Sequence, residues 1–162
     1  MRIITSDICD AHPDEVAVCE IQFRDFGKAS AFAGPCATVL VYEDHRKVKE
    51  TIELPGNGRV LIVDGGGSLR VALLGDRLAA RAMQNGWAGI IIHGAIRDSA
   101  AIDNLQFGVK ALGTTARRSS TELGGIAELP VSFGAATFRH GDWVYADADA
   151  VIVSRRKLLD FL

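Results

Sequence analysis

Cysteine is scarce in this chain, and the three that occur are not arranged as a paired framework. Cys9, Cys19 and Cys36 are odd in number, lie far apart and form no Cys-x-x-Cys motif. This pattern argues against a scaffold held by disulfides and against a zinc site built from thiolates. We therefore interpret the cysteines as reduced and mostly buried thiols.

An excess of one charge and long hydrophobic runs are also missing. The 162 residues carry 18 basic and 20 acidic side chains, for a net charge of −2. Because these charges form no basic stripe, direct binding of nucleic acid is not expected. No run approaches the roughly 20 apolar residues of a membrane span, and the first fifteen residues lack the apolar core of a signal peptide. We expect a cytoplasmic protein with no membrane partner.

The sequence does contain enough apolar material for one core, since 48% of its residues are hydrophobic. Its length is typical of one domain, so we expect a single domain over residues 1–162. Thr5, Ser6 and Asp7 indicate the start of a short helix. Residues 31–43 then predict β-structure that is interrupted at Gly34-Pro35.

The middle of the chain predicts alternating helices and buried strands. Residues 44–54 predict a helix, 55–58 a turn and 59–64 a buried strand. A second helix is indicated by Leu78, Ala82 and Met83 and is expected to end near Gly86, before a buried strand at 88–94. Strand, helix and strand at this spacing favour a right-handed parallel crossover. The glycine-rich loop after the first strand and the residues after the second should then face one crevice.

The last third of the chain changes character. Residues 107–113, 129–134, 136–147 and 150–154 are short, valine-rich and separated by glycine, and they predict strands packed on the crossover. The segment 114–125 has no apolar period and predicts a mobile loop, and 155–162 predict a final helix. The expected fold class is therefore α/β.

Two features of this crossover are candidates for chemistry. The loop DGGGS, residues 64–68, could bring backbone N–H groups close to an anion, and it loosely resembles the glycine-rich loop of methyltransferases that use S-adenosylmethionine. The loop matches neither of the nucleotide-binding motifs G-x-x-x-x-G-K-[ST] and G-x-G-x-x-G. A tight strand-to-helix turn also explains its glycines. His93 lies near the same crevice, where we expect it to be structural. The other feature is the spacing of Asp76 from Arg97-Asp98, with positions 77–96 between them. These twenty residues span a helix and a strand, so we expect them to return the chain to the same crevice.

This spacing carries a specific resemblance. The stretch VLIVDGGGSLRVALLGDRLAARAMQNGWAGIIIHGAIRD, residues 60–98, resembles the regulators of RNase E activity (RraA-like) and the related class II 4-hydroxy-4-methyl-2-oxoglutarate aldolases. The segments TSDICDAHPD, FRDFGKASAFAGP and GDWVYADADAVIV extend the resemblance over nearly the whole chain. The Asp-x20-Arg-Asp signature is similar to that of the aldolase branch.

The resemblance implies a swivelling β/β/α domain that assembles as a homotrimer, with active sites near subunit boundaries and a divalent cation, Mg²⁺ or Mn²⁺. By the same resemblance, Asp98 is the metal ligand, Arg97 binds substrate and acts in catalysis, and Asp76 is the second acid. The backbone segment that holds the substrate carboxylate corresponds to Gly75, Asp76, Arg77 and Leu78. Ala101 stands where many aldolases carry a further acid, so no additional metal-shell ligand is assigned.

The chemistry of these roles is coherent for a small 2-keto acid substrate. Mg²⁺ keeps several waters, so one direct carboxylate suffices, and Arg97 can donate a planar fork of hydrogen bonds to the keto acid. Retro-aldol cleavage of 4-hydroxy-4-methyl-2-oxoglutarate would give two pyruvates, with Asp76 managing protons. Oxaloacetate decarboxylation would pass through the same pyruvate enolate and is expected as a side activity.

Other interpretations stay open. Asp98 could instead cap a helix that begins at Ser99, Arg97 could be a solvated charge at a strand end, and Asp76 could favour a helix start. The chain could also be a protein-binding regulator that inhibits RNase E without chemistry, since one fold can host both functions. The resemblance implies that well-known regulators lack an acid at the position of Asp98, so its presence favours the enzyme. The methyltransferase label that some relatives carry finds no support in these residues.

Overall fold

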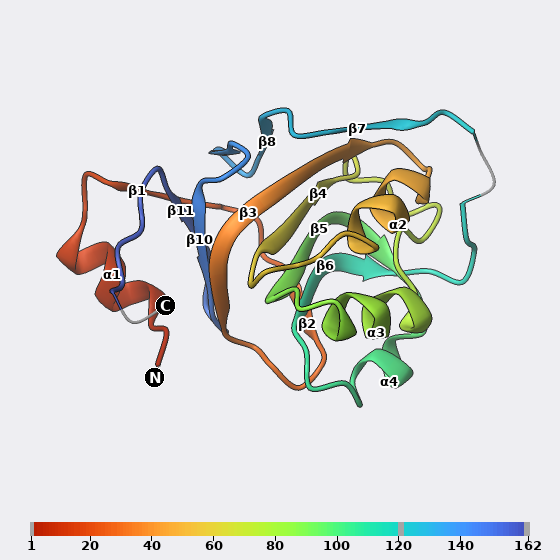
Figure 1. Cartoon of the computed structure of the whole chain (residues 1–162), viewed down its shortest axis with the longest axis horizontal. Helices are drawn as coiled ribbons and strands as arrows, with labels where there is room; N and C mark the ends of the chain where they lie inside the picture. The colour runs from red at the N-terminus through yellow and green to blue at the C-terminus, as the bar shows by residue number, and fades with distance from the viewer. Residues whose placement is uncertain (1, 120–121, 161–162) are drawn as a thin grey trace.

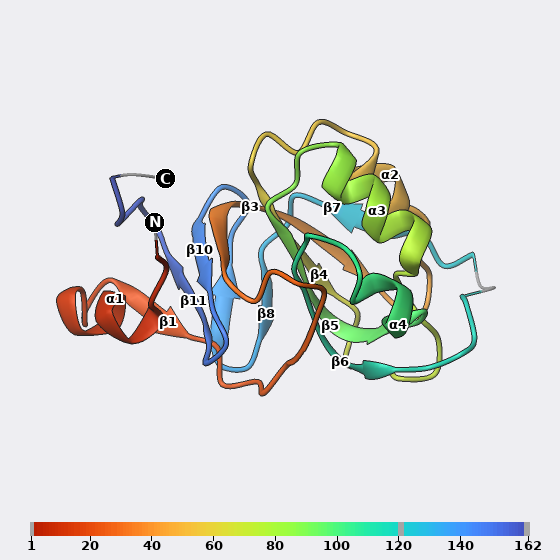
Figure 2. The ribbon, with the colours of Figure 1, turned by 90° about the horizontal axis from the view of Figure 1, so that it is seen from below.

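Four parallel strands form the centre of the structure. The computed structural model describes residues 2–119 and 122–160, and its central strands are β3 (Phe32–Val41), β4 (Val60–Asp64), β5 (Gly89–Ile96) and β6 (Val109–Thr114). Each connection carries one helix, in order α2 (Arg46–Ile52), α3 (Asp76–Gln84) and α4 (Ser99–Ile102). These three helices lie on one side of the parallel strands (Figures 1 and 2). The predicted α/β fold is confirmed.

Antiparallel strands extend this centre on both sides. The sheet runs in the order β1-β11-β10-β3-β4-β5-β6-β2, β7 also pairs with β3, and β8 and β9 form a separate two-stranded sheet. Helix α1 (Thr5–Ala11) lies beyond β1 and β11, at the opposite end of the molecule from α2 and α3 (Figure 1). The added strands are β1 (Val16–Val18), β2 (Arg24–Phe26), β7 (Gly125–Ala127), β8 (Val131–Phe133), β9 (Ala136–Phe138), β10 (Trp143–Ala146) and β11 (Val151–Ser154).

The core is divided between the two faces of the central strands. Because successive residues of a strand point to opposite faces, Leu61 and Val63 of β4 pack in the cluster that contains the helices, and Val60 and Ile62 pack in the cluster on the other face. Side chains on both faces of β4 are buried, which explains why this strand is an unbroken apolar run. Within the described ranges, no helix is long and apolar enough to cross a membrane. The cytoplasmic location stays a prediction.

The predicted crossover is confirmed in its pairing. β4 and β5 are parallel, with Val60 opposite Gly89 and Asp64 opposite His93, and α3 connects them. The predicted interruption at Gly34-Pro35 is wrong, because β3 runs through both residues. The N–H of Cys36 donates to Asp142 on the β10 side. The nitrogen of Pro35 therefore points to the β4 side, where pairing begins only at Cys36, and no ladder hydrogen bond is lost.

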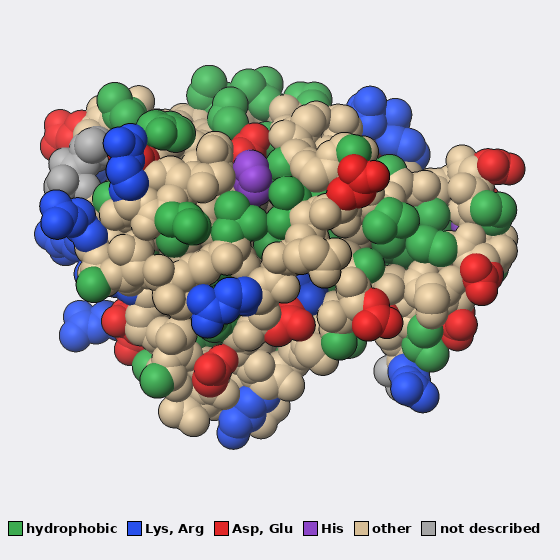
Figure 3. All heavy atoms as spheres, turned by 180° about the vertical axis from the view of Figure 1, so that it is seen from behind, with side chains coloured by type: hydrophobic (Ala, Val, Ile, Leu, Met, Phe, Trp, Pro, Cys, Tyr) green, Lys and Arg blue, Asp and Glu red, His purple; other side chains and the backbone are tan. Residues whose placement is uncertain are grey.

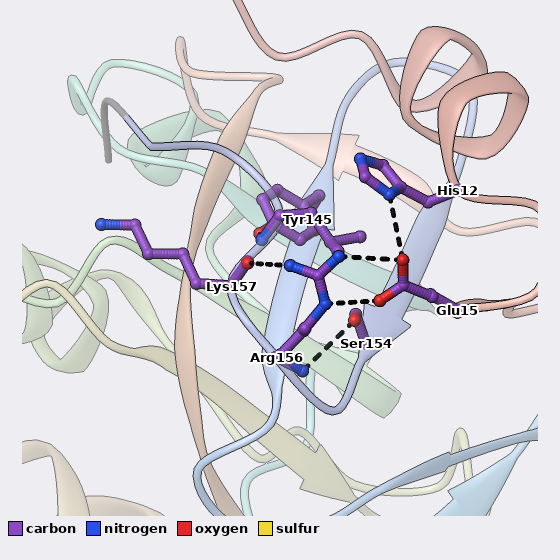
Figure 4. Close-up of polar contacts among 7 residues, drawn as sticks. His12, Glu15, Tyr145, Ser154, Arg156 and Lys157 are labelled. Carbon is purple, nitrogen blue, oxygen red and sulfur yellow. Dashed lines mark hydrogen bonds and ion pairs between the residues drawn. The ribbon is translucent and has the colours of Figure 1, made fainter.

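The predicted helix at 155–162 is also wrong over its described part. Residues 155–160 contain two bends, irregular backbone and a turn, and 161–162 lie outside the described residues. The N–H of Leu158 donates to Tyr145 Oη at 2.7 Å. Arg156 Nη2 donates to Glu15 Oε1 at 2.9 Å (Figure 4). These contacts with β10 and the segment after α1 replace the hydrogen bonds that a helix would make along its own backbone.

Candidate active site

A cavity of about 860 Å³ opens where the central strands meet the helices, beside the carboxyl end of β5. Its walls come from the segment that precedes α3, from one face of α3, from one side of α2 along its length and from residues that follow β5 and β6. The lining residues are His45, Lys49, Glu53, Ala72, Leu73, Leu74, Gly75, Asp76, Arg77, Leu78, Ala80, Arg81, Gln84, Arg97, Asp98 and Arg118. All six of the predicted site residues are in this set.

Backbone hydrogen bonds explain how residues some twenty positions apart meet here. The N–H of Leu73 donates to the carbonyl of Ala95 at 2.9 Å, and the N–H of Arg97 donates to the carbonyl of Leu74 at 2.9 Å. The chain before α3 thus runs beside the end of β5 as if it were one more strand. Gly75 follows directly and lies against the pair Arg97-Asp98.

The conformation of Asp98 shows which way its carboxylate points. Its backbone is left-handed, with φ of 60° and ψ of 38°, at the N-cap position of α4. The carboxylate makes no capping hydrogen bond to α4 in the described structure. Instead, Oδ2 accepts the N–H of Asp76 at 3.2 Å, at the start of α3. The interpretation of Asp98 as a cap of its own helix is therefore wrong.

Gly75 leaves room for this carboxylate. Its φ of −123° and ψ of −173° are extended values that any residue can adopt. A Cβ at this position would lie 2.8 Å from Asp98 Oδ2 and 3.6 Å from Arg97 Nε, however. Space, and not backbone freedom, is what a glycine supplies here. Asp76 begins α3, as the helix-start interpretation expects, and its Oδ1 accepts the N–H of Arg77 at 2.9 Å.

The glycine-rich loop does not contribute to the cavity, so the prediction that it shares the crevice with Arg97-Asp98 is wrong. The N–H groups of Gly65 and Gly67 both donate to the carbonyl of His93, and Gly66 donates to Asp64. The loop is a tight turn folded onto β5 at His93, three residues before that strand ends. His93 contacts the Asp64 carboxylate at 3.3 Å and stacks on Phe133, contacts of the kind that a structural role requires.

The sequence analysis missed a second wall of the cavity. His45, Lys49 and Glu53 follow one another at a spacing of four residues on the α2 side, and Arg118 comes from the segment after β6. That spacing is a helical signal that could have placed the three α2 residues on one face. No sequence signal pointed to Arg118, because its place on the wall depends on an isolated β-bridge to Ala72, which is distant in the sequence.

Basic side chains outnumber acidic ones in the lining of the cavity. Five basic residues (Lys49, Arg77, Arg81, Arg97 and Arg118) and three acidic residues (Glu53, Asp76 and Asp98) line it, and Arg81 is paired with Glu53 at 3.0 Å. Burial lowers the pKa of His45, and after an opposing contribution from Asp44, the positive charges of Lys49, Arg118 and Arg97 lower it further. The site is therefore suited to an anionic ligand.

The donor set fits a hard divalent cation that keeps water ligands. In the part of the chain that the structure describes, no three His, Cys, Asp or Glu side chains are gathered as a metal site. Asp98 offers one exposed carboxylate, and the missing side chain of Gly75 keeps the space beside it clear. Mg²⁺ is commonly held by one or two carboxylates together with waters and substrate, so these residues can hold it without a protein cage.

Comparison with known proteins agrees with this arrangement. The family model described as RraA-like, Aldolase/RraA, matches residues 5–153. A protein of Alkalilimnicola ehrlichii is 46% identical (98% of this chain, 99% of the relative), and one of Laribacter hongkongensis is 49% identical (98% and 100%). Both are named "Putative 4-hydroxy-4-methyl-2-oxoglutarate aldolase".

Two solved structures share the fold throughout. One, described as S-adenosylmethionine: 2-dimethylmenaquinone methyltransferase from Geobacillus kaustophilus, is 48% identical, with a TM-score of 0.94 over 96% of this chain and 97% of that one. The other, described as the RNA-processing inhibitor RraA from Thermus thermophilis, is 36% identical, with a TM-score of 0.94 over 99% and 97%.

Proposed function

The chain belongs to the RraA-like (Aldolase/RraA) family, and from this premise we propose that it is a divalent-metal-dependent lyase that cleaves 4-hydroxy-4-methyl-2-oxoglutarate into two pyruvates. The observation that carries the proposal is the contact between Asp98 and the start of α3, beside Arg97 and on the wall of a positively charged cavity. The names of the relatives at 46–49% identity support the same substrate.

Each residue contributes a distinct step. Asp98 would hold Mg²⁺ or Mn²⁺, which when bound supplies a Lewis acid for the 2-keto acid end of the substrate. The half-buried guanidinium of Arg97 donates two parallel hydrogen bonds to the oxygens of that end. The backbone from Gly75 to Leu78 includes the start of α3, where the positive end of the helix dipole favours a carboxylate.

Asp76 is the residue proposed to move the proton. Its Oδ1 is engaged by the N–H of Arg77, and its half-buried carboxylate also lines the cavity. In our scheme Asp76 takes the proton of the 4-hydroxyl through a water molecule, and the C3–C4 bond breaks to release one pyruvate. The bonding electrons remain on the second fragment as an enolate, whose developing charge Arg97 stabilises. Protonation of C3 of that fragment gives the second pyruvate.

Oxaloacetate decarboxylation follows from the same residues. Loss of carbon dioxide breaks the C3–C4 bond of oxaloacetate and leaves the same pyruvate enolate against Arg97. No additional group is needed, so we propose this reaction as a secondary activity.

We also propose that the chain assembles as a homotrimer. Leu40 of β3 and Ile126 of β7 are paired in register, and both are exposed, as is Tyr42 two residues further along. Hydrophobic side chains also gather in the upper half of the face seen in Figure 3. Apolar surface of this kind favours a partner, and a second copy of the chain is the occupant to test by light scattering of the purified protein. A monomeric mass would contradict the trimer.

The alternative is a protein-binding regulator of RNase E that does no chemistry. The fold shared with the Thermus RraA structure favours it. Asp98 separates the two proposals, because a surface that only binds protein has no need of a carboxylate aimed at the start of α3. The methyltransferase description of the Geobacillus structure does not change our proposal, because the glycine-rich loop 65–67 does not line the cavity.

The test is pyruvate release from 4-hydroxy-4-methyl-2-oxoglutarate and from oxaloacetate, after chelation and again with added Mg²⁺. We expect metal-dependent turnover by the wild type and losses of roughly 100-fold or more in Arg97→Ala, Asp98→Ala and Asp98→Asn. Glu50→Gln is the control, because Glu50 is exposed on α2 and does not line the cavity. Full metal-dependent turnover by Asp98→Asn would refute the assigned ligand. A folded wild type without turnover on either substrate would favour the regulator.

A further inference from the structure

The cavity extends beyond the residues that the proposed reaction uses, to a wall that carries Lys49 and Arg118. Neither side chain forms an ion pair with a carboxylate of residues 2–119 or 122–160. Arg81, in contrast, is neutralised by Glu53. Lys49 and Arg118 therefore offer their charge to whatever enters the cavity.

Arg118 is held in place by its neighbours. The N–H of Ala72 donates to the carbonyl of Arg117 at 2.7 Å, which fixes the segment after β6 to the segment before α3. One residue after Arg118, the buried hydroxyl of Ser119 accepts the backbone N–H of His45 at 3.0 Å and also contacts the His45 imidazole. The backbone on both sides of Arg118 is thus anchored, so this arginine is not on a free surface loop.

Lys49 comes to the same wall from the last turn of the short helix α2. Its N–H donates to the carbonyl of His45 at 3.0 Å, so its side chain lies one helical turn from His45 and on the same face. Burial lowers the pKa of His45, and the charges of Lys49 and Arg118 contribute in the same direction. Lys49, His45 and Arg118 are therefore neighbours in space, although Arg118 is far from the other two in sequence.

We propose that Lys49 and Arg118 are the specificity-determining residues that bind the carboxylate at the far end of the substrate. The proposal rests on the proposed lyase function, in which Arg97 and Asp98 already engage the keto acid end. A substrate with a second carboxylate matches a cavity that has a second group of cations, and a charge-assisted hydrogen bond to a guanidinium or ammonium is the contact expected there.

The two proposed reactions use this contact differently. In retro-aldol cleavage the distal carboxylate keeps its charge and leaves as the carboxylate of pyruvate, so Lys49 and Arg118 hold it throughout. In oxaloacetate decarboxylation the distal carboxylate becomes neutral carbon dioxide, and a cation that holds it gains nothing in the transition state. Loss of either cation should therefore lower aldol cleavage more than the turnover number for decarboxylation.

The experiment compares Lys49→Ala and Arg118→Ala with two matched controls. Lys47→Ala removes the same charge from α2, and Arg117→Ala removes it from the neighbouring position, and neither residue lines the cavity. The substrates are 4-hydroxy-4-methyl-2-oxoglutarate and 4-hydroxy-2-oxopentanoate, which has hydrogen in place of the distal carboxylate. We expect kcat/KM for the dicarboxylate to fall about 10- to 100-fold in each cavity variant. The monocarboxylate and the two controls should change by less than about twofold.

Binding of 2-oxoglutarate, which has no 4-hydroxyl to cleave, gives a second measurement by calorimetry. The cavity variants should bind it about 10- to 100-fold more weakly, with 2-oxobutanoate unaffected. If kcat/KM in the cavity variants fell equally for the dicarboxylate and the monocarboxylate, or fell for neither, the distal-carboxylate site would be overturned and the lyase proposal would stand. Absence of wild-type turnover would overturn the lyase, and the calorimetry would still decide whether Lys49 and Arg118 select a second carboxylate.

Discussion

Replacing Gly75 with alanine is the sharpest perturbation of the proposed metal site that leaves every charged residue in place. The added Cβ would lie 2.8 Å from Asp98 Oδ2, and ordinary contact begins at 3.4 Å, so the carboxylate must move by about 0.6 Å. Reacting groups need to be held within about 0.5 Å, and a displacement of about 1 Å can cost 100-fold in rate. We expect Gly75→Ala to lower metal-dependent pyruvate release by roughly 10- to 100-fold.

The same substitution should leave the fold intact. Extended backbone accepts alanine, and the loss of unfolded-state freedom stabilises by about 0.4–1 kcal/mol. This offsets the loss of the hydrogen bond from Asp76 to Asp98, worth about 1 kcal/mol. Thermal unfolding should therefore stay close to that of the wild type, as it should in Gly113→Ala, where the nearest side-chain atom is 3.7 Å away. Wild-type activity and metal response in Gly75→Ala would refute the assignment of Asp98.

Three further predictions concern stability and reactivity. Gly34→Ala places a Cβ 2.1 Å from the carbonyl oxygen of Gly58, so denaturant unfolding should show a free energy of unfolding lower by about 3 kcal/mol. An unfolding midpoint equal to that of the wild type would contradict this close approach. Hydrogen bonds from Arg46 hold the pKa of the buried Asp44 carboxyl well below its ordinary 3.8. Asp44→Ala should therefore destabilise by about 3 kcal/mol at pH 7, and the difference should narrow as the pH falls below about 4, whereas a constant difference would exclude this linkage. Burial raises the pKa of Cys36 to about 12, so Ellman's reagent should label this thiol only after unfolding, and rapid labelling of the native protein would show that it is accessible.

The parts of the fold that the sequence predicted are those with a strong local signal. The apolar run at 59–64 and the helical spacing of Leu78 and Ala82 each indicate one element, and both elements form. The spacing from Asp76 to Arg97-Asp98 predicted a shared cavity because a helix and a strand between two sites return the chain to the same edge of a parallel sheet. The structure places all three residues on that cavity.

The predictions that failed depended on contacts between distant segments. Gly34-Pro35 has the composition of a strand break, but the prolyl nitrogen faces a side where β4 has not yet begun. Residues 155–160 have helix-forming side chains, but the N–H of Leu158 is taken by Tyr145. Arg118 could not be assigned to the cavity, since its position depends on a bridge to Ala72, 46 positions earlier in the sequence. Local propensity contains none of these tertiary partners.

The backbone at Asp98 gives an independent reason to look for a charge-dependent role. A φ of 60° is tolerated by Asp and Asn and suits Gly best, so this conformation by itself does not require a carboxylate. The hydrogen bond from Asp76 could equally be accepted by the amide oxygen of Asn. What Asp supplies beyond these two alternatives is a negative charge, in a cavity where cations outnumber acids. The neighbouring cations favour a negative charge at this position, and a carboxylate is also the oxygen ligand that a divalent cation prefers. Asp98→Asn therefore separates the charge of this residue from its geometry.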